Sequence, residues 1–527
     1  EENTTASNNV AVGYFSLRKN TTGTNNVSVG YLALDANTTS SDNTAVGASA
    51  LTASTTGTQN VAFGSNTLTA NVTGSYNTAL GTSTLASNTA SYNTAVGSAA
   101  LNANTTGESN TAVGYQAGDA LTSGSYNIAI GHNALGSEDG RGRAVAIGYS
   151  ALTTQNADAD SYNVAVGFEA GKLITTGTKN VALGGLALDA ATTGIGNTAL
   201  GHQALTSDTA GQRSVAVGHG TLATQNFTSA TSAYNIGIGY DAGNLITTGI
   251  KNTLIGGLAG DAVTTGNSNV ALGYNALSGN TTASDNTAVG ASALLTNTTG
   301  SNNAAVGKSA LTANTTGYDN VAVGAGALDA NTTAYNNSAL GRNALGVNTT
   351  GTNNTGLGYA TLDANTTGGS NVAVGSLALS GNTTASNNVA VGFSALYLNT
   401  EGFDNTALGR LSLYANTTGD KNTAVGSQAL DANTTADNNT AVGYAALSQN
   451  TTGTQNVAVG SLSLDANTTA SENTGLGWNS LGSNTTGASN TAVGKSALAS
   501  NTTGAYNVSV GANAADALTT GGQNVAI

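Results

Sequence analysis

Asparagine recurs in Asn-Thr-Thr triplets, which match the Asn-x-Thr acceptor of N-linked glycans. Three interpretations of this column are open. The favoured one is a turn, because asparagine bonds its own backbone and threonine suits strand ends. The others are dense N-glycosylation and a flat threonine array that binds ice. Fifteen of these triplets, the candidate glycosylation sites, begin at Asn20, Asn37, Asn104, Asn280, Asn297, Asn314, Asn331, Asn348, Asn365, Asn416, Asn433, Asn450, Asn467, Asn484 and Asn501.

The histidines and aspartates lack the partners that a reaction or a metal would need. His132, His202 and His219 have no carboxylate or nucleophile at a fixed spacing, so a catalytic triad or a zinc site has little support. A calcium site needs roughly six to eight oxygen ligands, more than isolated carboxylates supply. Aspartates that share one place in the sequence pattern include Asp35, Asp329, Asp363, Asp431 and Asp465. We expect no enzyme activity, no metal site and no cofactor.

Tyrosine recurs at two fixed places beside a repeated phrase. Exposed rings could form a stripe that contacts sugars or a host surface, although rings that cover neighbouring repeats are the favoured interpretation. The first set is Tyr14, Tyr31, Tyr115, Tyr149, Tyr274, Tyr359 and Tyr444. The second set is Tyr76, Tyr92, Tyr126, Tyr162, Tyr234 and Tyr506.

All these residues stand at fixed distances from one repeated phrase, Asn-(Thr/Val)-Ala-(Val/Leu/Ile)-Gly. The phrase recurs every 17 residues along most of the chain. With its asparagine as position 1 and its glycine as position 5, the unit reads N-T/V-A-V-G-x-x-A-L-x-A-N-T-T-G-x-x. The sequon asparagines then stand at position 12 and the shared aspartates at position 10. A strict period of this length predicts one supersecondary unit stacked many times, in place of several globular domains.

The repeats fall into three sections of one continuous array of about 31 coils. Residues 1–131 and 261–527 are regular, whereas residues 132–260 carry loop insertions and a 72-residue duplication. The extra residues lie in 153–162 and 223–234, before the phrase, where a loop can lengthen without disturbing strands.

The pattern predicts two strands per coil, at positions 1–5 and roughly 7–11, separated by glycine and by Asn-Thr-Thr-Gly. We expect valine at position 4 and leucine at position 9 to form a continuous dry core. Where glycine replaces that leucine, a later leucine could refill the space. The pairs are Gly118 with Leu121, Gly171 with Leu173, and Gly243 with Leu245.

Coils stacked about 4.8 Å apart would bring the asparagines of positions 1 and 12 into two hydrogen-bonded columns. The expected core is thin, with one valine, one leucine and several alanines in each coil. Such a narrow coil with an alanine face suits close packing of several chains. We therefore expect an oligomer.

The composition excludes several classes of protein. The chain has no proline, which fits a backbone that is hydrogen-bonded at nearly every turn, and no cysteine, which excludes disulfides and thiolate metal sites. The net charge of −14 repels phosphate backbones, so nucleic-acid binding is not expected. No run of about 18 apolar residues could span a membrane. Without a methionine or a signal peptide, the chain is interpreted as a mature or trimmed piece of a longer precursor.

Asn-Val-Ala-Val-Gly followed by x-x-Ala-Leu resembles the head repeats of trimeric autotransporter adhesins. The full unit from Asn422 to Leu430, with Asn433-Thr434-Thr435, is even more similar to the repeats of long bacterial surface proteins and of phage tail-fibre-like proteins. The resemblance covers essentially the whole chain. It implies a left-handed parallel β-roll in which three chains pack around a common axis. The adhesin repeat is shorter than 17 residues, so the coil here has a longer turn.

The sequence thus predicts an all-β fold, an elongated parallel β-roll or β-solenoid that is left-handed and oligomeric. The expected function is a structural extracellular fibre or adhesin shaft at the cell surface. The alternatives are a phage-type tail fibre on a virion surface and an ice-binding β-solenoid. The expected partners are further copies of the chain, in a homotrimer or an end-to-end filament, and surface glycans or a host cell surface.

Overall fold

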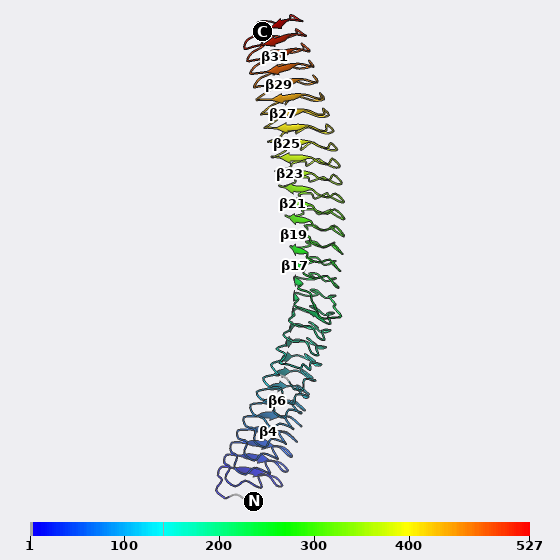
Figure 1. Ribbon diagram of the computed structural model, residues 1–527. Helices are drawn as coiled ribbons and strands as arrows, with labels where there is room; N and C mark the ends of the chain where they lie inside the picture. The colour runs from blue at the N-terminus through cyan, green and yellow to red at the C-terminus, as the bar shows by residue number, and fades with distance from the viewer. Residues whose placement is uncertain (1–3, 141) are drawn as a thin grey trace. The chain divides into compact units, whose positions relative to one another are not determined.

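Short parallel strands, one above the next, build the chain. The computed structural model describes residues 4–140 and 142–527, and every regular element in this part of the chain is a β-strand (Figure 1). The predicted all-β parallel β-solenoid with a spacing close to 17 residues is therefore confirmed. Within the described residues, no helix has the length and apolarity needed to cross a membrane.

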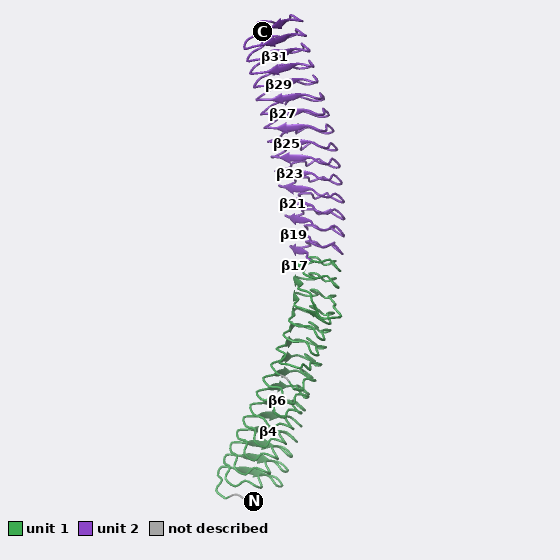
Figure 2. Cartoon of the chain, viewed as in Figure 1, with its two compact units in different colours: residues 1–267 green, residues 268–527 purple. Residues whose placement is uncertain are grey.

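The chain divides into two compact units, residues 1–267 and residues 268–527 (Figure 2). In the first unit, strands of successive coils pair in parallel, and β13 pairs with β15 in a small separate sheet. The strands are β1 Val10–Val12, β2 Val27–Val29, β3 Thr44–Val46, β4 Val61–Phe63, β5 Thr78–Leu80, β6 Thr94–Val96, β7 Thr111–Val113, β8 Ile128–Ile130, β9 Val145–Ile147, β10 Val164–Val166, β11 Val181–Leu183, β12 Thr198–Leu200, β13 Gly211–Gln212, β14 Val215–Val217, β15 Thr231–Ser232, β16 Ile236–Ile238 and β17 Thr253–Ile255.

The second unit repeats one coil without insertions. Each strand pairs with the next at the same repeat position, as Val321 pairs with Ser338. The strands are β18 Val270–Leu272, β19 Thr287–Val289, β20 Ala304–Val306, β21 Val321–Val323, β22 Ser338–Leu340, β23 Thr355–Leu357, β24 Val372–Val374, β25 Val389–Val391, β26 Thr406–Leu408, β27 Thr423–Val425, β28 Thr440–Val442, β29 Val457–Val459, β30 Thr474–Leu476, β31 Thr491–Val493, β32 Val508–Val510 and β33 Val525–Ala526.

The prediction of a second strand at positions 7–11 is wrong. These residues form a turn, because the backbone at positions 7 and 9 has a positive φ, as in Leu32 (56°) and Leu34 (47°). The turn still bonds to the adjoining coils: the N–H of Leu32 donates to the carbonyl of Tyr14, and that of Leu34 to the carbonyl of Ala50, both at 3.0 Å. Each coil is therefore held by one strand and one hydrogen-bonded turn.

The apolar interior consists mainly of alanine at positions 3 and 8 and leucine at position 9. Ala322, Ala327 and Leu328 have no exposed surface, so the predicted leucine column is confirmed. The inward place predicted for position 4 is wrong. Successive strand residues point to opposite faces, so an inward position 3 turns positions 2 and 4 outward. Val321 at position 2 is 43% exposed and Leu340 at position 4 is 49% exposed.

Large apolar side chains refill the interior where glycine replaces leucine at position 9. Leu121 is fully buried, as predicted. Leu173 and Leu245 are exposed, and the neighbouring Ile174 and Ile246 are buried in their place. The prediction failed for these two copies because the residue that points inward stands at position 12, three residues after the glycine.

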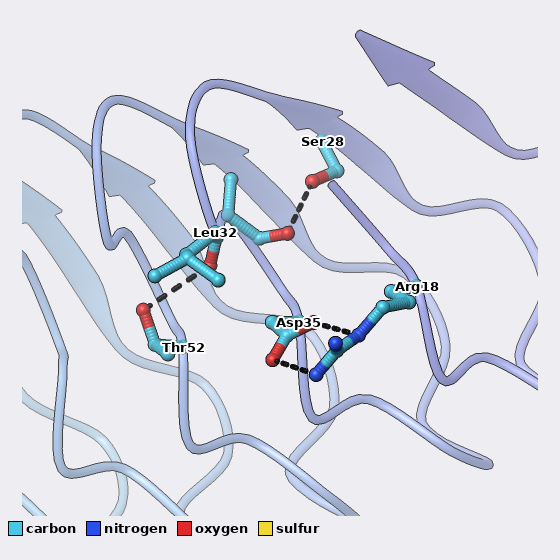
Figure 3. Close-up of polar contacts among 6 residues, drawn as sticks. Arg18, Ser28, Leu32, Asp35 and Thr52 are labelled. Atoms are coloured by element: carbon cyan, nitrogen blue, oxygen red, sulfur yellow. Dashed lines mark hydrogen bonds and ion pairs between the residues drawn. The ribbon is translucent and has the colours of Figure 1, made fainter. Parts of the chain in front are cut away.

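Side chains on the turn also link neighbouring coils. Arg18 and Asp35, both at position 10, form an ion pair with a nitrogen–oxygen distance of 2.9 Å, and the hydroxyl of Thr52 donates to the carbonyl of Leu32 at 3.2 Å (Figure 3). Partly exposed ion pairs stabilise proteins little. The ion pair on the turn therefore contributes little to stability. The turn is held mainly by its backbone hydrogen bonds and by the buried side chains of the interior.

Candidate functional site

The sequon asparagines lie inside the solenoid. Each of the fifteen is at most 2% exposed. Asn331 is typical: its Nδ2 donates to Oδ1 of Asn314, one coil earlier, at 2.8 Å and to the carbonyl of Ala334 at 3.2 Å. The predicted hydrogen-bonded column at position 12 is therefore confirmed.

A second asparagine column follows position 1. The backbone N–H of Asn354 donates to Oδ1 of Asn337 at 2.9 Å, and its Nδ2 donates to the carbonyl of Gly368 at 2.8 Å. Its own Oδ1 accepts from the backbone N–H of Asn371 at 3.0 Å. This column was also predicted. The two columns satisfy polar groups that the narrow interior would otherwise leave without partners.

These bonds bear directly on the glycosylation hypothesis. A glycan is attached through Nδ2 of the sequon asparagine, and in the folded coil this atom already donates hydrogen bonds in the interior, as Asn331 shows. Attachment to the folded chain would require the coil to open. The hypothesis of glycosylated sequons therefore requires modification before the coil closes.

The two threonines of each triplet differ in their surroundings. The hydroxyl of Thr332, at position 13, donates to the carbonyl of Thr349 in the next coil at 3.1 Å, whereas Thr333, at position 14, is exposed. An ice-binding surface of stacked threonines would therefore depend chiefly on the column at position 14.

An uncharged, largely apolar face runs along the strands of each unit. Position 4 carries only valine, leucine, isoleucine or phenylalanine, and position 2 carries only valine, threonine, isoleucine, serine or alanine. No charge interrupts either column. Exposed members include Val61, Leu80, Ile128, Leu183, Leu200, Ile238, Leu272, Val306, Leu357, Leu408 and Val459. We call this surface the sheet face. The sheet face was not predicted from the sequence, because position 4 was expected to lie in the core.

Aromatic rings at position 6 stack from coil to coil in the first unit. Neighbouring ring centroids lie between 5.2 and 5.8 Å apart. The stacks are Tyr14 with Tyr31, then Tyr115, His132, Tyr149 and Phe168, and then His202, His219 and Tyr240. At position 17, Tyr76 and Tyr92 stack at 5.1 Å. These stacked rings cover their neighbours, as the favoured interpretation predicted, so the faces between them are not open to a planar ligand.

The structure brings few of the titratable candidates together. Nδ1 of His219 lies 3.7 Å from Oδ1 of Asp241. At position 10, Asp363 accepts a hydrogen bond from Ser380 at 2.5 Å. In residues 4–140 and 142–527, no three histidine, cysteine, aspartate or glutamate side chains are grouped so as to hold a metal ion.

Two buried carboxylates that the sequence analysis did not identify replace asparagine at position 12 beside the insertions. Asp208 accepts from the side chain of Gln225 at 2.6 Å and from the backbone N–H of Phe227 at 3.1 Å. Glu138 accepts from Gln155 at 2.9 Å. The signal in the sequence was an acid at position 12 followed 17 residues later by glutamine, which occurs in both places.

Burial raises the pKa of several aspartates above its ordinary value, because removal of water disfavours the ionised carboxylate. This is the largest cause for each of them. They are Asp119, Asp189, Asp208, Asp329, Asp420, Asp431 and Asp465.

We expect the melting temperature to rise as the pH falls from neutral toward the ordinary aspartate pKa of about 3.9. These carboxyls bind a proton more tightly in the folded chain than in the unfolded chain. Their contribution to stability is therefore complete below the unfolded pKa and is lost as the pH rises through the folded values. Circular dichroism melts over this range measure the effect.

A salt series separates burial from the repulsion within an acidic chain. At about 1 M salt the Debye length falls to about 3 Å, which removes long-range repulsion but leaves the cost of burying a carboxylate. The rise on acidification should persist there. A melting temperature that stays flat or falls on acidification would contradict the expected sign.

No protein-family model matches the chain, and no curated protein matches it in sequence. An inference about function therefore has to come from the stacked coils, the buried asparagine columns and the sheet face.

Proposed function

We propose that this protein is a structural fibre element whose stacked coils provide stiffness and whose copies associate side by side through the sheet face. The in-register parallel pairing of strands through each unit supports the proposed stiffness. The observation that carries the second part is the uncharged, exposed apolar face at positions 2 and 4.

The size of this face favours association. Monomeric soluble proteins rarely expose a contiguous apolar patch larger than a few hundred Å². The sheet face repeats in every coil with strands about 4.8 Å apart, so its area grows with the number of coils. A second copy is the best occupant because it presents the same apolar face with the same 17-residue repeat. The resemblance to trimeric adhesins makes three the expected number of chains.

The proposed setting is extracellular, as an adhesin-like shaft at a cell surface that contacts glycans or a host surface through repeated shallow contacts. A phage-type tail fibre is the alternative that shares the same physical role. The ice-binding hypothesis has weaker support, because the threonine hydroxyls of position 13 already donate to backbone carbonyls, as in Thr332. No enzyme activity is proposed.

Lysine substitutions on the sheet face test the proposal. The unmodified chain should sediment as an oligomer, and a variant carrying Val321→Lys and Leu357→Lys should sediment as a monomer, because two charges per chain would be buried at each interface. Both residues are exposed and lie on strands, so the coil itself loses little. Analytical ultracentrifugation measures the mass, and circular dichroism checks the fold.

The matched control places the same charges elsewhere. Thr333→Lys with Thr367→Lys modifies the exposed position 14 in two coils and should leave the oligomer intact. A monomeric unmodified chain at all accessible concentrations, or equal dissociation of both variants, would refute association through the sheet face.

A further inference from the structure

A hollow opens on the second unit where a run of large side chains is interrupted. Ser394 stands at position 7 between Leu377 and Leu411, which hold this position in the two adjacent coils. The missing side-chain volume leaves an open hollow of about 390 Å³, within the size range of small-molecule sites. Phe393, Tyr397, Tyr414 and Asp431 also line it.

Aromatic rings form much of its wall. Tyr397 and Tyr414 occupy position 10 of successive coils and stack with their centroids 5.3 Å apart and their planes 6° apart. Both are half-buried. Tyrosine occurs at position 10 in these two coils alone. Together with Phe393 and the two leucines, they make a surface suited to an apolar or aromatic group.

Asp431 supplies the charge of this hollow. It occupies position 10 in the coil after Tyr414, where it is half-buried and lines the hollow. Burial raises the pKa of its carboxyl. Among the lining residues that the structure describes, it alone is charged. A carboxylate beside apolar and aromatic side chains favours a cationic donor.

We propose that this hollow binds a primary ammonium group carried on a small aromatic body. The ammonium donates to the carboxylate of Asp431, and the aromatic body fills the space that leucine occupies in the adjacent coils. The faces of nearby aromatic rings add attraction for the cation. The space beside Ser394 thus favours an aromatic group of the ligand, and Asp431 favours its positive charge.

The probe is 2-phenylethylammonium, and its uncharged analogue 2-phenylethanol is the matched ligand. Ligand-observed NMR titration into the full chain should give saturable binding of the ammonium, with a Kd on the order of 1 mM for so small a molecule. The alcohol should bind about tenfold more weakly, because it lacks the charge-assisted hydrogen bond. Equal affinity of the two ligands would overturn the proposal.

Two carboxyl variants test the charge. Asp431→Asn should weaken binding of the ammonium about tenfold and leave the alcohol unchanged. Asparagine already stands at position 10 at Asn102 and Asn244, so this coil accepts it. Asp465→Asn changes the same position outside the hollow and should leave both affinities unchanged. Equal effects of the two variants would show that the ammonium responds only to net charge and would also overturn the proposal.

A third variant tests the shape. Ser394→Leu should fill the hollow and abolish binding of both ligands. The backbone accepts leucine there, because Leu377 and Leu411 have φ values of 60° and 56°, close to the 50° of Ser394. Binding that survives this substitution would exclude the hollow as the site.

Discussion

Replacing Gly201 with alanine is expected to open the coil that contains it and to weaken its neighbours. Gly201 has a φ of +142°, which residues with a side chain rarely adopt. A Cβ on it would lie 2.6 Å from the carbonyl carbon of Gly218 in the next coil. No side-chain rotation relieves this contact, because the obstacle is backbone. We expect a loss of more than about 4 kcal/mol.

Gly196→Ala is the matched control five residues earlier. Gly196 has a φ of +70°, and nothing lies within 4 Å of the place where its Cβ would stand. This variant should lose only about 1–2 kcal/mol from backbone strain. Because stability in repeat arrays is largely local, hydrogen exchange at Thr198–Leu200 and Val215–Val217 is the measurement. Equal protection in both variants would show that the coils do not approach as closely as the structure has them.

The period itself predicted the solenoid and both asparagine columns, and the reason is physical. A side chain that recurs every 17 residues must meet its own copy when coils stack in parallel. Asparagine can both donate to and accept from an identical neighbour, as Asn331 and Asn314 do. Self-complementary residues in a strict repeat therefore reveal their partners without a structure.

Position 4 was wrongly predicted to point inward because its residues are always apolar. The informative signal in the sequence was that a large residue at position 3 occurs together with small residues at position 9. Leu254 is the large residue that stands where alanine is usual, and glycine replaces leucine at position 9 of the preceding coil, at Gly243, and of its own coil, at Gly260. Its side chain comes within 2.7 Å of where a Cβ on either glycine would lie. Positions that exchange volume share one interior, so position 3 points inward and position 4 outward.

The turn at positions 7–11 was mistaken for a strand because leucine gives no local sign of a positive φ. Leu34 adopts it at a cost that its full burial and the bonded turn offset. The clue lay in the copies with glycine at position 9. Gly118 and Gly171 have φ values of 59° and 58°, so glycine there matches the backbone of leucine in the other coils.

Replacing Asn354 with aspartate is expected to cost about 3–5 kcal/mol, the range for a buried charge that loses its partner. Aspartate could still accept from Asn371. Its second oxygen, however, would replace Nδ2, which lies 2.8 Å from the carbonyl oxygen of Gly368. Two acceptors would then face each other in an interior without water. Protonation of the new carboxyl relieves this repulsion, so the deficit should shrink as the pH falls.

Asn353→Asp makes the same chemical change one residue earlier. Asn353 is exposed at position 17, where it accepts from Nδ2 of Asn336 at 3.2 Å, a bond that aspartate can keep. This variant should stay within about 0.5 kcal/mol of the unmodified chain. Chemical denaturation and hydrogen exchange at Thr355–Leu357, followed across pH, compare the two. If the adjacent variants lose equal stability, or if the Asn354→Asp deficit does not respond to pH, the hydrogen bonds of the position-1 asparagine column do not stabilise the coil. A large, pH-dependent loss at Asn354 alone would show that its amide nitrogen, which donates to the carbonyl of Gly368, holds consecutive coils together.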